Sequence, residues 1–285
     1  MKKMTAKILD GKKIAEGIKE KIAGEISGWK KKPGLATVLV GDNPASKVYV
    51  SMKNVACRKY GFYSREIHLP ESISQKQLLE KVAELNKDDA IHGILVQLPL
   101  PPQIDENAIL SAIKPEKDVD GFHPESLGKL IQGNPSFVPC TPRGVIHLIK
   151  STGEKLEGKH AVIIGRSNIV GKPTAILLLQ ENCTVTVCHS RTTNLAEEVK
   201  KADIIVAAVG KPKLVTKEMV KQGAVVIDVG TTKLADGRLC GDVDFEGVKE
   251  KASWITPVPG GVGPMTIAML LQNTFEAAKR IEKTG

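Results

Sequence analysis

The chain has 285 residues, and its 41 Lys and Arg against 32 Asp and Glu leave a formal net charge of +9. A hydrophobic fraction of 41% excludes a disordered chain, and the length suggests about two domains, each able to bury a core. The longest wholly apolar run, Ile204 to Val209, is far shorter than the ~20 residues that cross a bilayer. The N-terminus also lacks the apolar region of a secretory signal. We therefore expect a cytoplasmic protein that has no membrane partner.

The basic residues are concentrated near the N-terminus, where residues 1–32 hold ten lysines against four acidic residues. Such a cluster could bind nucleic acid, but Ile14, Ile18, Ile22 and Ile26 recur every four residues through it. This spacing is typical of an amphipathic helix whose lysines face solvent. We therefore expect no nucleic-acid partner. The five cysteines show no CxxC spacing, which predicts reduced thiols and no metal site.

Short apolar strands alternate with helical stretches along the first half, which is the signature of parallel α/β units. A capping box formed by Ser74 and Gln77 opens one of these helices. Prolines that follow Gln97 end the third strand, because proline cannot continue a central ladder. We expect residues 116–140 to be irregular. The strands are predicted at 35–40, 64–69 and 91–97, and the helices at 46–60, 74–87 and 105–113.

The second half begins at Thr141 and Pro142, which have the form of a helix N-cap followed by proline at the first helical position. This helix is predicted to end near Thr152. A tighter alternation follows, which predicts a doubly wound sheet. Its strands are expected at 160–164, 184–188, 203–209 and 224–229, with helices up to Gln180 and at 194–201 between them.

The apolar positions from Thr266 to Ile281 have helical spacing, and we expect this last helix to pack back onto the first domain. The predicted fold class is therefore α/β with two domains. An N-terminal α/β catalytic domain at 1–140 is completed by the C-terminal helix at 265–285. A Rossmann-type dinucleotide-binding domain occupies 141–264.

A glycine-rich turn, Gly165 to Gly171, lies between the strand 160–164 and the next helix. Such a turn places backbone N–H groups and the positive end of a helix against a phosphate. A P-loop is excluded, because five residues separate the glycines and Pro173 replaces the hydroxyl residue that binds magnesium. The spacing matches the dinucleotide fingerprint only in part, but its position at the start of the doubly wound half favours that interpretation.

The end of the second strand of this half indicates which dinucleotide binds. An NAD enzyme places an acidic residue there for the ribose hydroxyls, whereas this chain has Ser190 and Arg191. A hydroxyl and a guanidinium suit a 2′-phosphate, so the sequence favours NADP. Arg166, inside the glycine turn, is a second cation that could reach the same phosphate, although Arg191 could also be a solvated loop residue.

A second group of polar residues lies in the first half. Tyr49 and Lys53 are four residues apart on a predicted helix, so both project from one face. Gln97 ends the third strand, at the sheet edge where open α/β folds bind ligands. A partly buried lysine there could relay protons, or it could be an ordinary surface lysine. Asp118 and Asp120 add two carboxylates in a loop, where turn chemistry is the alternative to catalysis.

Five motifs in this order together resemble the bifunctional methylenetetrahydrofolate dehydrogenase/methenyltetrahydrofolate cyclohydrolase family. The resemblance covers essentially the whole chain, from about residue 6 to residue 283. The motifs are Tyr49-x-x-x-Lys53, Val96-Gln-Leu-Pro99, Lys117-Asp-Val-Asp-Gly121, Gly165-Arg-Ser-x-Ile-Val-Gly171 and Pro257-Val-Pro-Gly-Gly-Val-Gly-Pro-Met-Thr266.

The resemblance implies oxidation of 5,10-methylenetetrahydrofolate with NADP, followed by hydrolysis of the methenyl product to 10-formyltetrahydrofolate. It makes Lys53 the catalytic lysine, with Tyr49 near the folate, Gln97 orienting the lysine and Asp120 bonding the pterin. The implied folate-site residues are Tyr49, Val50, Ser51, Met52, Lys53, Val96, Gln97, Leu98, Asp120, Pro259, Gly260, Gly261, Val262 and Gly263. The implied or predicted cofactor residues are Gly165, Arg166, Ser167, Ser190, Arg191 and Thr231.

The resemblance also implies a homodimer joined through the cofactor domains and a role in one-carbon metabolism and purine biosynthesis. One alternative is another NADP-dependent dehydrogenase of the same two-domain architecture, such as an amino-acid or shikimate dehydrogenase. A second is a basic module that binds nucleic acid or another polyanion.

Overall fold

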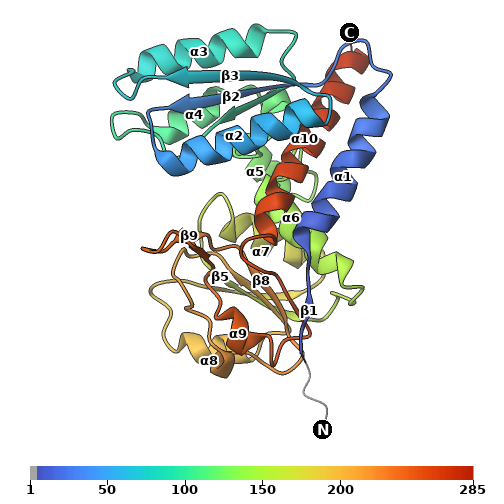
Figure 1. The fold of residues 1–285 in the computed structure, drawn as a ribbon, viewed down its shortest axis with the longest axis vertical. Coiled ribbons are helices and arrows are strands. Elements are labelled where there is room, and N and C mark those ends of the chain that lie inside the picture. The colour runs from blue at the N-terminus through green and yellow to red at the C-terminus, as the bar shows by residue number, and fades with distance from the viewer. Residues whose placement is uncertain (1–4, 285) are drawn as a thin grey trace. The chain divides into compact units, whose positions relative to one another are not determined.

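The computed structural model describes residues 5–284, with the side chains of 283 and 284 left aside. Residues 1–4 of the predicted first domain and residue 285 of the predicted last helix lie outside the described residues. The chain divides into two compact units (Figure 1). Each unit has a parallel sheet with helices packed on it, which confirms the predicted two-domain α/β fold.

Unit 1 comprises the chain up to Ala15 together with Thr141–Thr266, and unit 2 comprises Glu16–Cys140 and the chain from Ile267. The boundaries therefore differ from the prediction at the N-terminus, since the described residues up to Ala15 group with the second half of the chain. The reason is a two-residue strand, β1 (Lys7–Ile8), which pairs in parallel with β11 (Trp254–Ile255). A strand this short carries no periodic signal in the sequence.

Unit 2 is built on a three-stranded parallel sheet in the order β3-β2-β4. Alternate residues of β2, such as Ala36 and Val38, share a core with α3 and α4, whereas Thr37 on the opposite face contacts α2. The sheet is therefore covered on both faces. Its elements are β2 (Gly34–Val40), α2 (Pro44–Lys59), β3 (Tyr63–Leu69), α3 (Gln75–Lys87), β4 (Gly93–Val96), α4 (Glu106–Ala112), a 3-10 turn (Pro115–Lys117) and α5 (Pro124–Ile131).

Local signals explain where these helices begin. The Asn43 side chain caps α2 by accepting from the backbone N–H groups of Ala45 and Ser46. The capping box predicted at Ser74 and Gln77 is present at the start of α3. The helix α5 was not predicted, because its eight residues are too few for a clear helical period.

Unit 1 contains a six-stranded parallel sheet in the order β1-β11-β8-β7-β5-β6 (Figure 1). The chain passes from β5 outward to β6 and then returns to the other side of β5 at β7. The order in which strands are added to the sheet therefore reverses between β5 and β7, as predicted for a doubly wound domain. Its further elements are β5 (His160–Ile164), α7 (Gly171–Gln180), β6 (Thr184–Cys188), α8 (Leu195–Lys200), β7 (Ile204–Ala207), a 3-10 turn (Lys217–Met219), β8 (Val225–Asp228), the hairpin β9 (Thr232–Lys233) and β10 (Leu239–Cys240), and α9 (Phe245–Val248).

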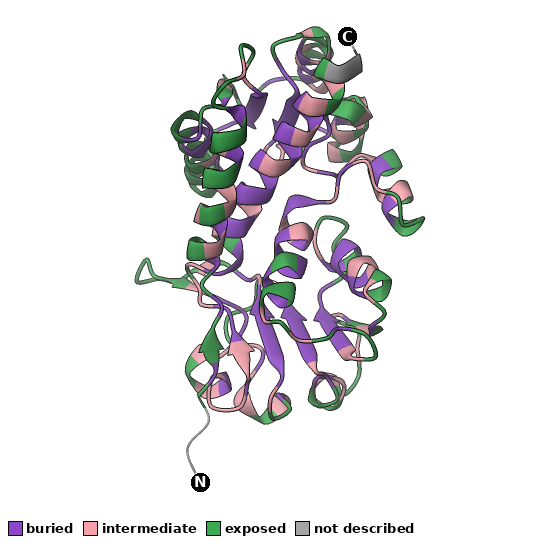
Figure 2. Ribbon diagram, turned by 90° about the vertical axis from the view of Figure 1, so that its right-hand side faces the viewer, coloured by how far each residue is buried: buried purple, intermediate pink, exposed green. Residues whose placement is uncertain are grey.

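Three helices contribute residues to both units, namely α1 (Gly11–Ile26), α6 (Cys140–Ser151) and α10 (Val262–Thr284). The expected N-cap at Thr141 is wrong, because α6 already begins at Cys140 and the Thr141 hydroxyl bonds that of Thr266 at 2.9 Å. The central strands of both sheets are buried, while many outer helix faces are exposed (Figure 2). Within residues 5–284, no helix combines the length and apolar character that a membrane crossing requires.

Candidate functional site

In unit 2, two polar side chains from separate elements meet at the carboxyl end of the sheet. Lys53 on α2 donates a hydrogen bond from Nζ to Oε1 of Gln97, which follows β4, at 3.0 Å. Gln97 Nε2 donates to the backbone carbonyl of Leu98 at 2.7 Å. That second bond fixes which end of the amide faces the lysine. Gln97 therefore holds the amine while leaving its remaining hydrogen-bonding positions available for a ligand.

The charge of Lys53 depends on burial and on a nearby carboxylate. Desolvation lowers the pKa of the Lys53 amine, and the Asp120 carboxylate partly opposes this. Burial in turn raises the pKa of Asp120, against the effects of Lys53 and of a hydrogen bond with Cys140. A lysine with a lowered pKa exists in part as a neutral amine, which can accept a proton. The structure thus brings together Lys53, Gln97 and Asp120.

The loop that carries Asp120 is organised by the preceding carboxylate. Asp118 is buried and accepts hydrogen bonds from the backbone N–H groups of Phe122 (3.1 Å) and His123 (2.9 Å) and from the Ser126 hydroxyl (2.7 Å). Burial raises the pKa of Asp118 to about 6, although these bonds act in the opposite direction. The two carboxylates therefore differ in role, since Asp118 forms the turn and Asp120 lies near the lysine.

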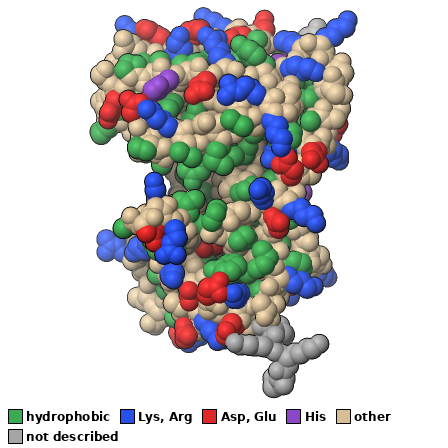
Figure 3. Space-filling view, in the orientation of Figure 1, with side chains coloured by type: hydrophobic (Ala, Val, Ile, Leu, Met, Phe, Trp, Pro, Cys, Tyr) green, Lys and Arg blue, Asp and Glu red, His purple; other side chains and the backbone are tan. Residues whose placement is uncertain are grey.

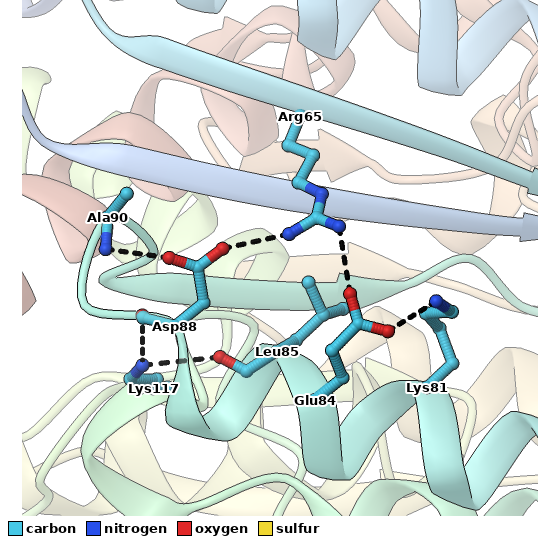
Figure 4. Close-up of polar contacts among 7 residues, drawn as sticks. All are labelled: Arg65, Lys81, Glu84, Leu85, Asp88, Ala90 and Lys117. Carbon is cyan, nitrogen blue, oxygen red and sulfur yellow. Dashed lines mark hydrogen bonds and ion pairs between the residues drawn. The ribbon is translucent and has the colours of Figure 1, made fainter.

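Lys117, the first residue of the same motif, anchors the loop to the end of α3. Its Nζ donates to the backbone carbonyls of Leu85 (3.3 Å) and Asp88 (2.8 Å), as Figure 4 shows. The Asp88 carboxylate accepts from Arg65 at 2.8 Å and from the Ala90 N–H at 2.9 Å. Burial lowers the pKa of the Lys117 amine, and the carbonyls at the helix end satisfy it. Lys117 is thus a structural anchor.

Two glycines allow this loop to lie against the sheet. A Cβ on Gly93 of β4 would be 2.7 Å from both methyl carbons of Val119. Gly121 has φ +77°, and a Cβ there would be 2.7 Å from the backbone nitrogen of Pro139. Glycine at both positions therefore lets the loop approach this closely. Asp120 lies between Val119, which packs on Gly93, and Gly121.

The other predicted folate-site residues of unit 2 differ in accessibility. Tyr49 and Met52 on α2 are 39% and 45% exposed, and Ser51 is also exposed. Val50 and Val96, in contrast, are 1% and 2% exposed. The side chains of these two valines lie in the core, so they support the helix and the strand that carry Lys53 and Gln97.

The glycine-rich segment 257–263 belongs to unit 1. The Gly261 N–H donates to the Pro257 carbonyl at 2.9 Å, and the Gly260 carbonyl accepts from the N–H of Lys12 at 2.9 Å. Gly260 has φ +109°, which favours glycine. Pro259 and Gly263 are exposed, whereas Val262 is buried at the start of α10.

The glycine turn after β5 has the close packing expected of a dinucleotide site. Gly165 has φ +125°, and a Cβ there would be 2.3 Å from the carbonyl oxygen of Ala208. A Cβ on Gly171 would be 2.3 Å from the carbonyl oxygen of Gly165, so helix α7 packs directly on the turn. The Ser167 hydroxyl accepts from the N–H groups of Val170 (3.2 Å) and Gly171 (3.3 Å) and so holds the turn against the start of this helix.

The remaining predicted cofactor residues lie at neighbouring strand ends of unit 1. The Gly165 N–H donates to the Cys188 carbonyl at 2.9 Å, which joins the glycine turn to the end of β6. Ser190 and Arg191, just beyond it, are exposed, and so is Arg166 in the turn. Thr231 is exposed in the loop that follows β8.

Sequence reasoning missed several buried polar residues. Asn54 accepts from the hydroxyls of Thr37 and Ser64, both at 2.9 Å, and so ties α2 to the sheet beside Lys53. Asp228 and Asp242, buried in unit 1, were also missed. An acidic residue at the end of an apolar strand was the available signal for Asp228. In the part of the chain that the structure describes, no group of three or more His, Cys, Asp or Glu could hold a metal ion.

These features define a class of protein. A doubly wound sheet with a glycine turn at its reversal point is a dinucleotide-binding domain, and a separate α/β unit carries a lysine suited to proton transfer. Two family models match the chain. The tetrahydrofolate dehydrogenase/cyclohydrolase catalytic domain matches residues 9–120, and the NAD(P)-binding domain of the same family matches residues 139–282. The chain belongs to the tetrahydrofolate dehydrogenase/cyclohydrolase family of enzymes.

Known proteins of this family are similar over almost their whole length. The bifunctional protein FolD of Listeria innocua is 59% identical over 279 residues, which cover 97% of this chain and 98% of that protein. The crystal structure of the bifunctional FolD enzyme from Campylobacter jejuni is 50% identical with a TM-score of 0.94, covering 96% of this chain and 99% of that one. The Trypanosoma brucei enzyme, solved with NADP and an inhibitor, is 44% identical with a TM-score of 0.94, covering 97% and 98%.

Proposed function

We propose that this enzyme oxidises 5,10-methylenetetrahydrofolate with NADP and then hydrolyses the methenyl product to 10-formyltetrahydrofolate. The observation that carries the proposal is the Lys53–Gln97 hydrogen bond of 3.0 Å near Asp120, in a chain that belongs to this family over both units. A lysine whose pKa is lowered by burial, in a chain that also has a dinucleotide-binding domain, suits a reaction sequence of one hydride transfer and one hydrolysis.

Lys53 acts in the hydrolysis. Water adds to the electrophilic methenyl carbon and loses one proton, which gives a hydroxyl adduct. The hydroxyl then becomes the formyl carbonyl as it loses its proton, the bond from this carbon to one of its two nitrogens breaks, and that nitrogen takes up a proton. A neutral amine near that carbon accepts the proton, and such general-base help is typically worth 10²–10⁴-fold. Burial lowers the pKa of Lys53 and so favours the neutral form. Gln97 orients the amine through its fixed amide.

The oxidation makes a different demand. Hydride transfer from the methylene carbon releases no proton, so it requires only that folate and dinucleotide are positioned together. The glycine turn fits a dinucleotide, because a Cβ at Gly165 or Gly171 would be 2.3 Å from backbone oxygen. Bound NADP supplies the hydride acceptor. On the protein side, Gly165, Arg166 and Ser167 are proposed to hold it from the turn, with Ser190, Arg191 and Thr231 completing the set.

NADP rather than NAD is proposed from the cations at the end of β6. Arg191 is exposed, and its backbone N–H donates to Nδ1 of His189 at 3.1 Å, which orders the turn. Arg166 is also exposed on the adjacent glycine turn. A guanidinium binds a phosphate by paired hydrogen bonds, whereas no acidic residue lies between Cys188 and Asn194 to bind ribose hydroxyls.

The folate is proposed to bind Asp120 through its pterin and to lie along the exposed Tyr49. The backbone of the glycine-rich segment Pro259–Gly263 is proposed to contact the same ligand, since Gly260 and Gly263 present no side chain to a ligand. The neighbours of Lys53 and Gln97 (Val50, Ser51, Met52, Val96 and Leu98) complete the proposed site.

A cytoplasmic homodimer that serves one-carbon metabolism and purine biosynthesis is proposed as the working form. In support of the dimer, β6 is an edge strand of unit 1, where Val187 is 38% exposed and Leu179 of α7 is 58% exposed. Exposed edges with apolar residues favour pairing with another chain. Lys and Arg side chains are mixed with Asp and Glu on the face drawn in Figure 3, rather than clustered in the basic patch that favours nucleic-acid binding.

The test supplies 5,10-methylenetetrahydrofolate with NADP and records NADPH, the methenyl intermediate and the formyl product together. NADPH must appear, followed by 10-formyltetrahydrofolate. Absence of NADPH would contradict the proposal. Another NADP-dependent dehydrogenase is not favoured, because both family models match and the relatives cover nearly the whole chain. A polyanion-binding module would instead show salt-dependent nucleic-acid binding without NADPH formation.

A further inference from the structure

Asp242 is a fully buried carboxylate in unit 1 with an unusual set of partners. Its Oδ2 accepts hydrogen bonds from the backbone N–H groups of Val209 (2.7 Å) and Gly210 (3.1 Å). Its other oxygen, Oδ1, is buried and accepts no hydrogen bond. One carboxylate oxygen therefore holds two successive residues of the loop that leaves β7.

A second carboxylate fixes the position of Asp242 itself. Asp228, at the end of β8, accepts from the backbone N–H groups of Asp242 (2.9 Å), Val243 (2.9 Å) and Gly230 (3.0 Å). Burial raises the pKa of Asp228 to about 6, and the nearby Asp242 carboxylate adds to the rise. The two carboxylates form a chain of contacts that runs from the end of β8 to the end of β7.

Two glycines make room for this chain. A Cβ on Gly230 would be 2.3 Å from Oδ1 of Asp242, and a Cβ on Gly241 would be 1.9 Å from Oδ2 of Asp228. Both carboxylates are therefore held close against backbone that carries no side chain. Adjacent buried carboxylates repel each other and lose hydration, so they destabilise a domain unless hydrogen bonds compensate them. Here the compensating donors are backbone N–H groups, so both carboxylates hold loop backbone in place.

The loop held by Asp242 lies where a dinucleotide crosses the sheet. The reversal point of the sheet lies between β5 and β7, and ligands bind at the carboxyl ends of the strands beside it. The carbonyl of Ala208, next to Val209, packs against Gly165 of the glycine turn, where a Cβ would be 2.3 Å away. The loop held by Asp242 therefore supports the glycine turn from the β7 side.

We propose that Asp242 is a positioning residue for the dinucleotide: it fixes the Val209–Gly210 loop against the glycine turn, and Asp228 fixes Asp242. The identity of the dinucleotide as NADP rests on the proposed function. The contacts of Asp242 all lie within unit 1, whereas Lys53 lies in unit 2. Loss of the Asp242 carboxylate is therefore expected to weaken dinucleotide binding and to leave proton transfer at Lys53 intact.

The test compares Asp242→Ala with wild type in two assays. The dissociation constant of NADP, measured without folate, is expected to rise at least tenfold. Hydrolysis of 5,10-methenyltetrahydrofolate added directly needs no hydride acceptor and is expected to stay within twofold. Asp242→Asn is expected to recover most of the affinity, because one amide oxygen can accept both N–H groups. Asp236→Ala, an exposed carboxylate of the same unit paired with Arg238, is the matched control and is expected to change neither value.

Unchanged NADP affinity in Asp242→Ala would overturn the inference. An equal loss of NADP affinity and of methenyltetrahydrofolate hydrolysis would also overturn it, because it would indicate a general structural role. If Asp242→Ala does not fold, Asp242→Ser is used instead. The shorter serine hydroxyl cannot accept from both the Val209 and Gly210 N–H groups, so NADP is expected to bind at least threefold more weakly than to wild type. Failure of the proposed function is distinguishable. In that case the wild type binds NADP but does not oxidise methylenetetrahydrofolate, while the difference between wild type and Asp242→Ala persists.

Discussion

Replacing Gln97 by Glu tests whether Lys53 must be neutral to act. In the wild type the Lys53 amine lies 3.0 Å from Gln97 Oε1, and the shape of the side chain hardly changes on substitution. A carboxylate at that distance attracts an ammonium by about 5 kcal/mol at an effective dielectric constant of ~20. Both residues are partly accessible to solvent, so solvent screening reduces this to about 2–3 kcal/mol. The carboxylate therefore raises the pKa of Lys53 and retains its proton.

Hydrolysis of methenyltetrahydrofolate by Gln97→Glu is expected to be roughly 30- to 150-fold slower than in wild type near neutral pH, the rate equivalent of about 2–3 kcal/mol. The activity is expected to recover as the pH rises, because the amine then loses its proton. The assay follows the loss of methenyl absorbance across a range of pH.

The matched control is Gln97→Leu, which removes the hydrogen bond to Lys53 without adding a charge. Both variants also lose the bond from Gln97 to the Leu98 carbonyl. The difference between them therefore reports the carboxylate alone, and Gln97→Glu must be the slower of the two below the pKa of Lys53. Wild-type hydrolysis by Gln97→Glu, or a loss that does not vary with pH, would refute the assignment of Lys53 as a neutral base.

Asp120→Ala is expected to weaken folate binding and to depress both activities together, since a bond to a charged group is worth about 1.5–3 kcal/mol; loss of only one activity in steady-state kinetics would contradict a shared anchor. Arg191→Ala is expected to raise KM for NADP by roughly 10- to 150-fold and to leave the weak activity with NAD nearly unchanged, and equal use of the two dinucleotides by the wild type would count against this assignment. Gly93→Ala is expected to destabilise the protein by about 1–3 kcal/mol in urea unfolding, because the new methyl carbon meets Val119 at 2.7 Å. Gly128→Ala, in a helix with open space around it, is expected to stabilise the protein by roughly 0.5–1 kcal/mol. If Gly93→Ala were instead the more stable of the two variants, the loop that carries Val119 would move aside at no cost.

The parts of the fold that the sequence predicts are those with a repeating pattern or a local cap. The strands at 160–164 and 184–188 match the structure residue for residue, because apolar residues with β-propensity are bounded by turn residues. The capping box of Ser74 and Gln77 is local and was predicted. The helix Pro124–Ile131 and the strand Lys7–Ile8 are too short for a period to be read, and the strand depends on a partner about 250 residues away in the chain.

The candidate site was predictable to the same extent. Tyr49 and Lys53 share a helix, and Gln97 ends a strand, so their spacing and position are visible in the sequence. Apart from the family resemblance, residue type and spacing do not distinguish Asp118 from Asp120, because their roles depend on the contacts of each carboxylate in the folded loop. The same limit applies to Asp242, whose contacts come from a loop more than 30 residues earlier in the chain.

The central claim is that one lysine performs the hydrolysis while hydride transfer needs no proton acceptor. The most direct measurement mixes the Lys53→Met variant with 5,10-methylenetetrahydrofolate and NADP and records NADPH and methenyl absorbance in the same trace. We expect NADPH and the methenyl compound to rise together, with no enzymatic formation of 10-formyltetrahydrofolate, whereas the wild type accumulates little methenyl compound. Hydrolysis of methenyltetrahydrofolate by Lys53→Met at the wild-type rate would contradict the account.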